Sequence, residues 1–364
     1  MTLRRIAFVD SWLQAVATGS GTAVAIGGLG AALQKLGHTV ERIAPPPDRL
    51  PLTLRRILFN LRTIRALRRA PFDLVVGFDI DGSGFALAPN KPYVVSIKGV
   101  IAEEMQHEGG RIRALFEVLS RIEGWNARRA ERVLATSDYC RRMIHRHYGV
   151  AWERIAVVPE GIDLPRWQAA LQAVPPRCDA RPTILCVARQ YPRKHVADLI
   201  AAAPKLLRRL PDLQLHIVGD GPEHANLVQQ ATALGLTERI RWSQNIGFAA
   251  LVEAYAHADV FCLPSRQEGF GIVFLEAMAA GLPVVSTSAA AIPEVVVQGA
   301  TGLLIAPGDI NALAGALFIL LSETERRTAY AARSQERIAR YDWQRIAEQF
   351  VEAVRPQMDT DGHR

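Results

Sequence analysis

The sequence has few cysteines, no long apolar run and no charge excess in its second half. Its four cysteines form no C-x-x-C pair, and a chain of 364 residues builds a core without disulfides, so we expect a reducing compartment, the cytoplasm. No apolar stretch reaches the ~18 residues that a membrane-spanning helix needs, and the apolar run ending at Asp10 is too short for a signal-peptide core. These absences predict a soluble protein that is still able to bind at a membrane surface.

The basic excess is confined to one part of the chain. Residues 1–163 contain 23 basic and 16 acidic residues, a net charge of +7, whereas residues 164–364 contain 20 of each. A hydrophobic content of 49% also excludes an intrinsically disordered chain.

Short apolar runs alternate with helical patterns, which predicts parallel sheets built from βαβ units. A chain of this length exceeds one hydrophobic core. We therefore expect an α/β protein with two doubly wound, Rossmann-like domains that face a cleft. The predicted parts are an N-terminal domain at 1–163, a proline-rich linker at 164–182 and a C-terminal domain at 183–341. A helical pattern at 342–356 is expected to pack back on the first domain. The expected strands are residues 6–9, 39–43, 73–76, 93–97, 133–135, 155–158, 183–188, 215–218, 240–242, 260–263 and 284–286.

The most informative stretch is residues 264–278, PSRQEGFGIVFLEAM. It follows a predicted strand, contains a glycine loop and enters a helix near Gly271, where backbone N–H groups can bind an anion or sugar hydroxyls. Glu268 and Glu276 lie eight residues apart. Two glutamates at such an interval often occur by chance, so a solvated pair beside a tight turn is the alternative interpretation.

The whole string resembles the signature of the retaining glycosyltransferases of family 4, which have the GT-B fold. Other segments match this family in order. Residues 157–163, VVPEGID, resemble its V-P-N-G-V-D, and Arg189 with Lys194 resembles its G-R-x4-K. Residues 215–223, LHIVGDGPE, resemble its I-V-G-x-G-P-E, and later blocks match at 281–285, 292–296 and 301–304.

The resemblance implies that the C-terminal domain binds a nucleotide-diphosphate-sugar donor. Arg189 and Lys194 would face the diphosphate, where two fixed cations stabilise the leaving group more in the transition state than in the ground state. Without the family pattern, each would be interpreted as an ordinary surface cation. Glu276 would accept hydrogen bonds from the ribose and Glu268 from the transferred sugar. Other implied donor contacts are Gly21, Gly269, Phe270, Gly271, Ile272 and Val273. The nucleotide base would lie near Ile246, in the loop after the predicted strand at 240–242, where family members mostly use backbone contacts.

The implied reaction is a metal-independent, retaining transfer without a cofactor. The acceptor would be a glycan, a lipid-linked molecule or a small molecule, and a leaving-group oxygen would act as the base. Asp79-Ile80-Asp81 is a D-x-D triplet, but it lies in the wrong domain for a donor-binding metal. The residues that could line the acceptor side are Ser20, Thr22, Asp81, Glu103 and Glu104.

The chain departs from the family pattern at Lys98, where many members have the histidine of a His-Gly pair that contacts the transferred sugar. A lysine can donate to a sugar hydroxyl or offset diphosphate charge, and we count Lys98 among the catalytic candidates. The alternative function is a nucleotide-sugar-binding GT-B protein with weak or no transferase activity.

Residues 52–69 contain six arginines and no acidic residue. Leu54, Ile57, Leu58, Leu61, Ile64 and Leu67 follow helical spacing. The segment is either a helix packed on its own domain with a solvated arginine face, or a patch that attracts anionic lipid at the cytoplasmic face of a membrane or an acidic acceptor. No basic–aromatic platform is present, so we expect no nucleic-acid partner.

Overall fold

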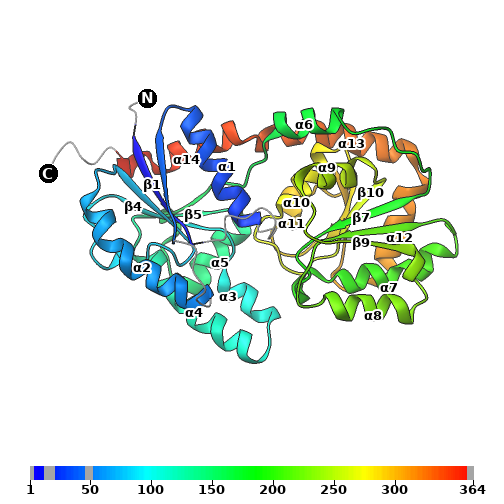
Figure 1. Ribbon diagram of the computed structural model, residues 1–364, viewed down its shortest axis with the longest axis horizontal. Helices are drawn as coiled ribbons and strands as arrows, with labels where there is room; N and C mark the ends of the chain where they lie inside the picture. The colour runs from blue at the N-terminus through cyan, green and yellow to red at the C-terminus, as the bar shows by residue number, and fades with distance from the viewer. Residues whose placement is uncertain (1–3, 12–20, 46–51, 359–364) are drawn as a thin grey trace. The chain divides into compact units, whose positions relative to one another are not determined.

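The computed structural model describes residues 4–11, 21–45 and 52–358. These fall into two compact units. Residues 4–11, 21–45, 52–161 and 343–358 form the first, and residues 162–342 form the second. Figure 1 shows both units and labels most of their helices and several of their strands. Each unit is a sheet covered by helices on both faces, which confirms the predicted doubly wound α/β architecture.

The first unit contains a six-stranded parallel sheet in the order β2-β1-β3-β4-β5-β6. The strand order reverses between β1 and β3, and ligands of doubly wound sheets bind outside the carboxyl ends of the strands at such a reversal. The elements of this unit are β1 (Arg5–Val9), α1 (Gly21–Lys35), β2 (Thr39–Ile43), α2 (Leu52–Arg69), β3 (Leu74–Phe78), η2 (Phe85–Leu87), β4 (Tyr93–Ile97), α3 (Ile101–Glu104), η3 (Met105–His107), α4 (Gly110–Arg129), β5 (Arg132–Ala135), α5 (Asp138–Tyr148), η4 (Trp152–Arg154), β6 (Ile155–Val157) and α14 (Trp343–Met358).

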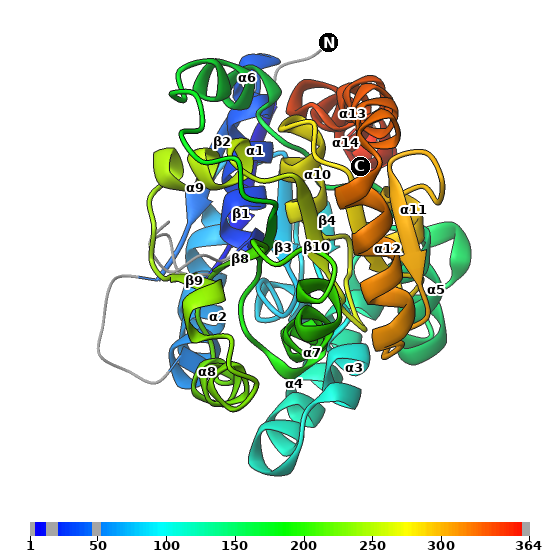
Figure 2. The ribbon, with the colours of Figure 1, turned by 90° about the vertical axis from the view of Figure 1, so that its right-hand side faces the viewer.

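The second unit contains another six-stranded parallel sheet, in the order β12-β11-β10-β7-β8-β9. Its reversal lies between β7 and β10. The elements are α6 (Leu164–Gln172), β7 (Thr183–Val187), η5 (Pro192–Lys194), α7 (Val196–Leu207), β8 (Gln214–Val218), α8 (His224–Ala233), η6 (Thr237–Arg239), β9 (Ile240–Ser243), α9 (Phe248–Ala256), β10 (Val260–Leu263), α10 (Ile272–Ala279), β11 (Val284–Thr287), α11 (Ile292–Val295), β12 (Gly302–Ile305), α12 (Ile310–Ser322), α13 (Thr324–Ile338) and η7 (Ala339–Tyr341). On one face of this sheet, α12 lies beside α7 (Figure 2).

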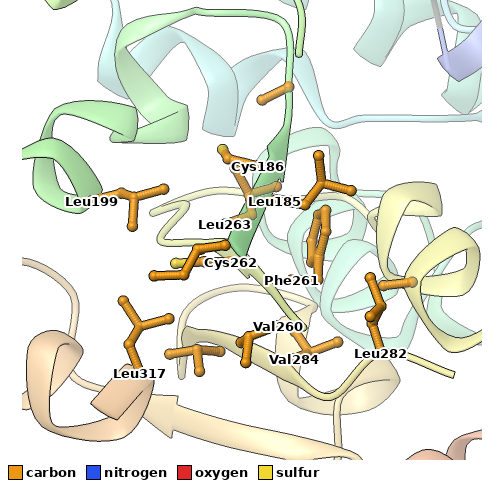
Figure 3. Packing of buried hydrophobic residues seen from close by; sticks show 14 of the residues in the cluster. Leu185, Cys186, Leu199, Val260, Phe261, Cys262, Leu263, Leu282, Val284 and Leu317 are labelled. Carbon is orange, nitrogen blue, oxygen red and sulfur yellow. The ribbon is translucent and has the colours of Figure 1, made fainter. Parts of the chain in front are cut away.

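The core of the second unit forms around β7 and β10, whose central residues are buried on both sides. Figure 3 shows Phe261 and Leu263 of β10 packed among Leu185, Leu199 and Leu317. Continuous apolar runs are expected for parallel strands that helices cover on both faces. This packing fixes the ends of β7 and β10, from which the candidate site is built.

Helices α6 and α14 belong to different units. Residues 164–172, expected to belong to a linker, form α6 in the second unit, where the Trp167 ring lies edge-on to Tyr255 at 5.5 Å. Helix α14 belongs to the first unit, where Phe350 lies 6.4 Å from Phe8 between ring centroids. A side chain at Gly28 of α1 would collide with the Trp343 indole, so the glycine permits close packing.

Among the described helices, none combines the length and apolar character needed to cross a bilayer.

Candidate functional site

The loops that follow β7 and β10 are joined at the carboxyl edge of the second sheet. The backbone oxygen of Arg193 accepts hydrogen bonds from the Arg266 N–H at 2.9 Å and from the Ser265 hydroxyl at 3.1 Å. Ligands of doubly wound sheets bind where the strand order reverses, and β7 and β10 flank that position here. The two loops therefore form one structural framework at the expected binding position.

An ion pair between Lys194 and Glu268 connects the same two loops. Lys194 Nζ lies 2.6 Å from Glu268 Oε1, and the side chains are 14% and 9% exposed. Both residues were predicted from sequence, and the structure brings them together. Because both side chains are largely buried, each charge holds the other in place. The pair therefore fixes two groups side by side: the Lys194 ammonium, which can bind phosphate, and the Glu268 carboxylate, which can bind hydroxyl groups.

Helix α10 begins directly after this loop. Gly271 has a φ of +92°, and a Cβ there would lie 2.5 Å from the Phe274 ring, so the turn requires glycine. The first N–H groups of a helix have no intrahelical acceptor, which leaves the backbone at Ile272 and Val273 suited to anions or hydroxyls. The Phe270 side chain itself is buried and packs against Tyr341 at 5.7 Å between ring centroids.

Glu276 lies in the second turn of α10. Its Oε2 accepts a hydrogen bond from the Tyr255 hydroxyl at 2.8 Å. Burial raises the pKa of Glu276 to about 7, while the Tyr255 hydrogen bond acts in the opposite direction. The carboxyl group is consequently close to the midpoint of its titration near neutral pH.

The loop after β7 also contains a buried residue that sequence reasoning missed. The Gln190 side chain donates to the Gly219 carbonyl at 2.9 Å and its Oε1 lies 2.8 Å from His224 Nδ1. These contacts attach the loop to the end of β8 and leave the adjacent Arg189 exposed, with its guanidinium 5.9 Å from the Tyr191 ring. The only feature of the sequence that pointed to Gln190 was its position next to Arg189.

Ile246, the predicted base-side residue, follows β9 and is partly buried against the core. It lines a small cavity of about 60 Å³ together with His216, Ser243 and Ala250. A cavity of this volume is far smaller than a nucleobase site, and the backbone contact predicted near Ile246 stays a prediction.

In the first unit, Lys98 follows β4 and pairs with Glu160, which follows β6. Lys98 Nζ lies 2.9 Å from Glu160 Oε1, and both side chains are buried. The Lys98 N–H donates to Asp79 Oδ1 at 2.8 Å. Glu160 was not among the predicted site residues, although it stands where the family pattern has asparagine.

Asp81 is a structural residue, in contrast to the expected acceptor-facing role. It is completely buried. Its Oδ2 accepts hydrogen bonds from the Ser11 N–H at 2.9 Å, the Ser11 hydroxyl at 2.7 Å and Arg56 at 3.3 Å, and Oδ1 accepts one from Asn60 at 3.0 Å. Because both carboxylate oxygens are engaged by the protein and the side chain is buried, Asp81 does not present a surface to an acceptor.

The other acceptor-side candidates have different surroundings. Glu103 accepts a hydrogen bond of 2.5 Å from Tyr139 and pairs with His147 at 2.5 Å. A Cβ at Gly99 would lie 2.8 Å from Glu104 Oε1, which places that carboxylate beside the chain segment after Lys98. Gly21 and Thr22 begin α1, and Ser20 lies outside the described residues.

Glu123 on α4 is a buried carboxyl group that the sequence analysis missed. Its Oε2 accepts hydrogen bonds from the Ile101 N–H at 3.0 Å and from the Tyr148 hydroxyl. Burial, and secondarily the charge of Asp79, raises the pKa of Glu123 well above its ordinary value. Glu123 thereby anchors the start of α3, which carries Glu103 and Glu104.

Helix α2 packs on its unit through a face that overlaps the predicted apolar stripe only in part, at Leu67 and at the half-buried Leu58 and Ile64. Arg56, Phe59, Asn60 and Leu67 are buried, whereas Leu61 is 56% exposed. Leu54 and Ile57 are exposed as well. A groove of about 400 Å³, here named the α2–α4 groove, is lined mainly by apolar side chains from α2, η2, α4 and the loop after β3: Ile57, Leu61, Ile80, Leu87, Val118 and Trp125.

Two family models match the chain, and together they cover most of it. Glycosyltransferase Family 4 matches residues 19–166, and Glycosyl transferases group 1 matches residues 170–337. The second match contains the Lys194–Glu268 pair and Glu276.

Curated relatives match both units in part. The chain is 33% identical over 247 residues to a glycogen synthase of Mycobacterium tuberculosis, a match that covers 67% of this chain and 59% of the relative. It is 36% identical over 225 residues to a phosphatidyl-myo-inositol mannosyltransferase of Mycolicibacterium smegmatis, covering 60% of this chain and 55% of the relative. The matched region therefore spans somewhat more than half the length of these relatives.

A solved structure shares the fold over nearly the whole chain. The Anabaena protein HepE, crystallised in complex with UDP and glucose, has a TM-score of 0.75 at 21% identity, covering 97% of this chain and all of that chain. At this identity the likeness shows the fold, and the family models and curated relatives carry the assignment. The chain belongs to the group 1, family 4 glycosyltransferases, with the GT-B fold.

Proposed function

We propose that the protein is a retaining, metal-independent glycosyltransferase. It moves a sugar from a nucleotide-diphosphate-sugar donor to a hydroxyl of a glycan, lipid-linked or small-molecule acceptor. The observation that carries this proposal is the Lys194–Glu268 pair between the loops after β7 and β10. The names of the relatives, which include a mannosyltransferase and a protein bound to UDP and glucose, support this class of donor.

In the proposed reaction, the bond between the anomeric carbon and a diphosphate oxygen breaks. The acceptor hydroxyl oxygen forms a new bond to the same carbon, from the face that the diphosphate leaves. The hydroxyl proton passes to an oxygen of the leaving diphosphate, so the protein needs no carboxylate as a base. Lys194 and Arg189 stabilise the charge that develops on the diphosphate, and these fixed cations take the place of a metal ion.

The carboxylates have binding roles in this proposal. Glu268, held by Lys194 at 2.6 Å, accepts a hydrogen bond from the transferred sugar. Glu276 accepts hydrogen bonds from the ribose through Oε1, which receives none from the part of the chain that the structure describes. The α10 N-terminus after Gly271 contributes backbone N–H groups to the phosphates.

The test compares Lys194→Ala and Glu268→Gln with the unchanged protein, using labelled nucleotide sugars, candidate acceptors and EDTA in the buffer. Removing one preorganised group that stabilises transition-state charge typically lowers kcat about 100-fold or more. We expect such a loss for Lys194→Ala and a smaller one for Glu268→Gln, with the product keeping the anomeric configuration of the donor by NMR.

Lys205→Ala is the matched control, because Lys205 is an exposed lysine on α7 of the same unit. Undiminished transfer by both site variants would contradict the site assignment. An inverted product would contradict retention, and loss of transfer in EDTA would contradict metal independence.

A second candidate function is nucleotide-sugar binding without efficient transfer. The observation that favours it is the engagement of Lys98 by Glu160 at 2.9 Å, since a paired lysine is less available than the family's histidine. Lys98→His separates the two functions. Transfer that appears only in this variant, in a protein that otherwise only binds donor, would support the second candidate.

We also propose that the protein acts in the cytoplasm at an anionic membrane surface through residues 52–69. Arg62, Arg65, Arg68 and Arg69 are exposed on α2, and Leu54, Ile57 and Leu61 are exposed on the same helix. Apolar side chains beside arginines suit the boundary between lipid chains and anionic headgroups. A lipid-linked acceptor would then be met at that surface.

A further inference from the structure

Lys98 and Glu160 form a buried ion pair at the carboxyl edge of the first sheet. Lys98 directly follows β4 and Glu160 follows β6, with β5 between these strands. The Nζ–Oε1 distance is 2.9 Å, and the side chains are only 7% and 5% exposed. The pair lies outside the ends of the strands, which is where parallel sheets bind their ligands.

The surrounding backbone holds both residues in place. The Lys98 N–H donates to Asp79 Oδ1 at 2.8 Å, and Lys98 Nζ lies 5.6 Å from the centroid of the Phe78 ring. On the other side, a Cβ at Gly161 would lie 2.6 Å from the Trp343 ring, so the segment after Glu160 is tightly packed. Neither side chain depends on a ligand for its position.

The pair is incompletely satisfied. Glu160 Oε2 is buried and accepts no hydrogen bond from the described residues. Two charges removed from water recover their lost hydration only when further hydrogen bonds satisfy the remaining lone pairs and protons. Fold stability therefore gives little reason for this pair, and one carboxylate oxygen of Glu160 lacks a hydrogen-bond donor.

The two residues are physically coupled. They replace the histidine and the asparagine of the family pattern described above. A lysine alone would be an uncompensated buried cation, and a glutamate alone an uncompensated buried carboxylate. At 2.9 Å each provides the counter-charge for the other, so losing either partner leaves a buried charge uncompensated and lowers stability.

We propose that Lys98 and Glu160 together form a binding site for sugar hydroxyls that determines which sugar the protein accepts. Glu160 Oε2 accepts a hydrogen bond from one hydroxyl, and Lys98 Nζ donates to the oxygen of a neighbouring hydroxyl. This inference rests on the proposed function, and the hydroxyls belong either to the transferred sugar or to the acceptor. Sites built to hydrogen-bond a hydroxyl strongly discriminate against analogues that lack it.

The first experiment compares Glu160→Gln, Lys98→His and the double variant Lys98→His/Glu160→Asn with the unchanged protein. For each protein we would measure kcat/KM for UDP- and GDP-linked sugars that differ in one hydroxyl, and KM for the acceptor. The affinity for the free nucleoside diphosphate and the melting temperature are measured as well. We expect Glu160→Gln to lower kcat/KM for the preferred sugar about tenfold, the loss of one hydrogen bond to a charged group.

The double variant is expected to melt near the temperature of the unchanged protein, because no buried charge is left unpaired, while its ranking of sugars changes. Affinity for the free nucleoside diphosphate should stay the same in every variant. A change in KM for the nucleotide sugar assigns the hydroxyl to the donor, and a change in KM for the acceptor assigns it to the acceptor. Glu323→Gln is the matched control, since Glu323 forms an exposed ion pair with Arg326 at 2.8 Å.

A second experiment needs no variant and uses deoxy analogues of the preferred donor and acceptor with the unchanged protein. The proposal expects at least one hydroxyl whose removal reduces kcat/KM about 100-fold or more, because dedicated hydroxyl sites reject analogues that lack the hydroxyl by up to ~10⁴–10⁵-fold. It is overturned if every deoxy analogue reacts equally well. It is also overturned if Glu160→Gln and the double variant keep the original sugar ranking and KM values and differ only in melting temperature. Absence of transfer by the unchanged protein contradicts the proposed function itself, whereas intact transfer with unchanged ranking contradicts only the role of the pair.

Discussion

At Glu276, burial opposes the charge that a ribose-binding carboxylate requires. The Tyr255 hydroxyl donates to Oε2 at 2.8 Å and favours the ionised form, but loss of hydration has the larger effect and raises the pKa from 4.5 to about 7. The folded state therefore binds this proton more tightly than the unfolded chain does. The contribution of Glu276 to stability is present below pH 4.5 and is lost as the pH rises through about 7.

We predict that Glu276→Gln makes the free energy of unfolding less dependent on pH between 5 and 8. The difference from the unchanged protein should approach ~3 kcal/mol across this interval, because each unit of pKa shift corresponds to ~1.4 kcal/mol. Binding of a nucleoside diphosphate should strengthen with rising pH in the unchanged protein more than in the variant. Urea unfolding and calorimetric titration at several pH values measure both effects.

Tyr255→Phe provides the complementary variant. It removes the hydrogen bond that favours the ionised carboxylate, so the transition should move to higher pH. If Glu276→Gln and the unchanged protein lose stability in parallel over this range, Glu276 does not carry the raised pKa.

At the scale of elements, the sequence predicted strands better than helix faces. Buried parallel strands are continuous apolar runs, and the predicted strand at 260–263 coincides with β10. Helix α2 was predicted within residues 52–69, but only part of its apolar stripe is buried, while Leu54, Ile57 and Leu61 are exposed. It docks through Arg56 and Asn60, which bind Asp81 at a separation of more than 20 residues. Apolar periodicity cannot detect a polar contact between distant segments.

In the candidate site too, contacts between residues far apart in the sequence could not be predicted from local sequence patterns. Lys194 and Glu268 are 74 residues apart, and only the family pattern, not local chemistry, indicated a shared site. Gln190 and Glu123 were missed because a single buried polar residue leaves no periodic or motif signal. Glu160 differed from the family pattern, but its pairing with Lys98 required the structure.

For α2, we predict that Arg62→Gln, Arg65→Gln, Arg68→Gln and Arg69→Gln combined weaken binding to vesicles of anionic phosphatidylglycerol in phosphatidylcholine. Each basic residue near an anionic surface contributes ~1 kcal/mol, so binding should fall by about two to three orders of magnitude. Arg56 must be left unchanged, because it is buried against Asp81. Vesicle sedimentation at fixed ionic strength measures the partition.

The control removes the same number of charges elsewhere, with Arg208→Gln, Arg326→Gln, Arg340→Gln and Arg345→Gln, all of which are exposed. A separate Leu61→Ser variant tests the contribution of the exposed apolar side chains of α2. If the α2 set and the control set bind vesicles equally, the membrane proposal is wrong.

At the scale of the whole molecule, net charge is distributed unevenly between the two halves of the chain. Residues 1–163 carry the entire net charge of +7, while residues 164–364 are neutral overall. The proposed donor site belongs to the neutral part, where two cations, Arg189 and Lys194, stand on the loop after β7. Donor binding must then depend on the position of individual charges, since the summed field of the second unit offers no general attraction for an anion.

This distribution predicts the response of thermal stability to nucleotides. One of UDP, GDP or ADP at a hundredfold excess over its dissociation constant should raise the free energy of unfolding of the bound unit by ~2.7 kcal/mol. Lys194→Ala should remove most of this shift. The double variant Lys205→Gln/Arg208→Gln loses more charge from exposed positions of the same unit and should keep the shift in full. Because both variants lower the net charge of the second unit, equal loss of the shift in both would mean that overall charge, rather than the cation held beside Glu268, attracts the diphosphate.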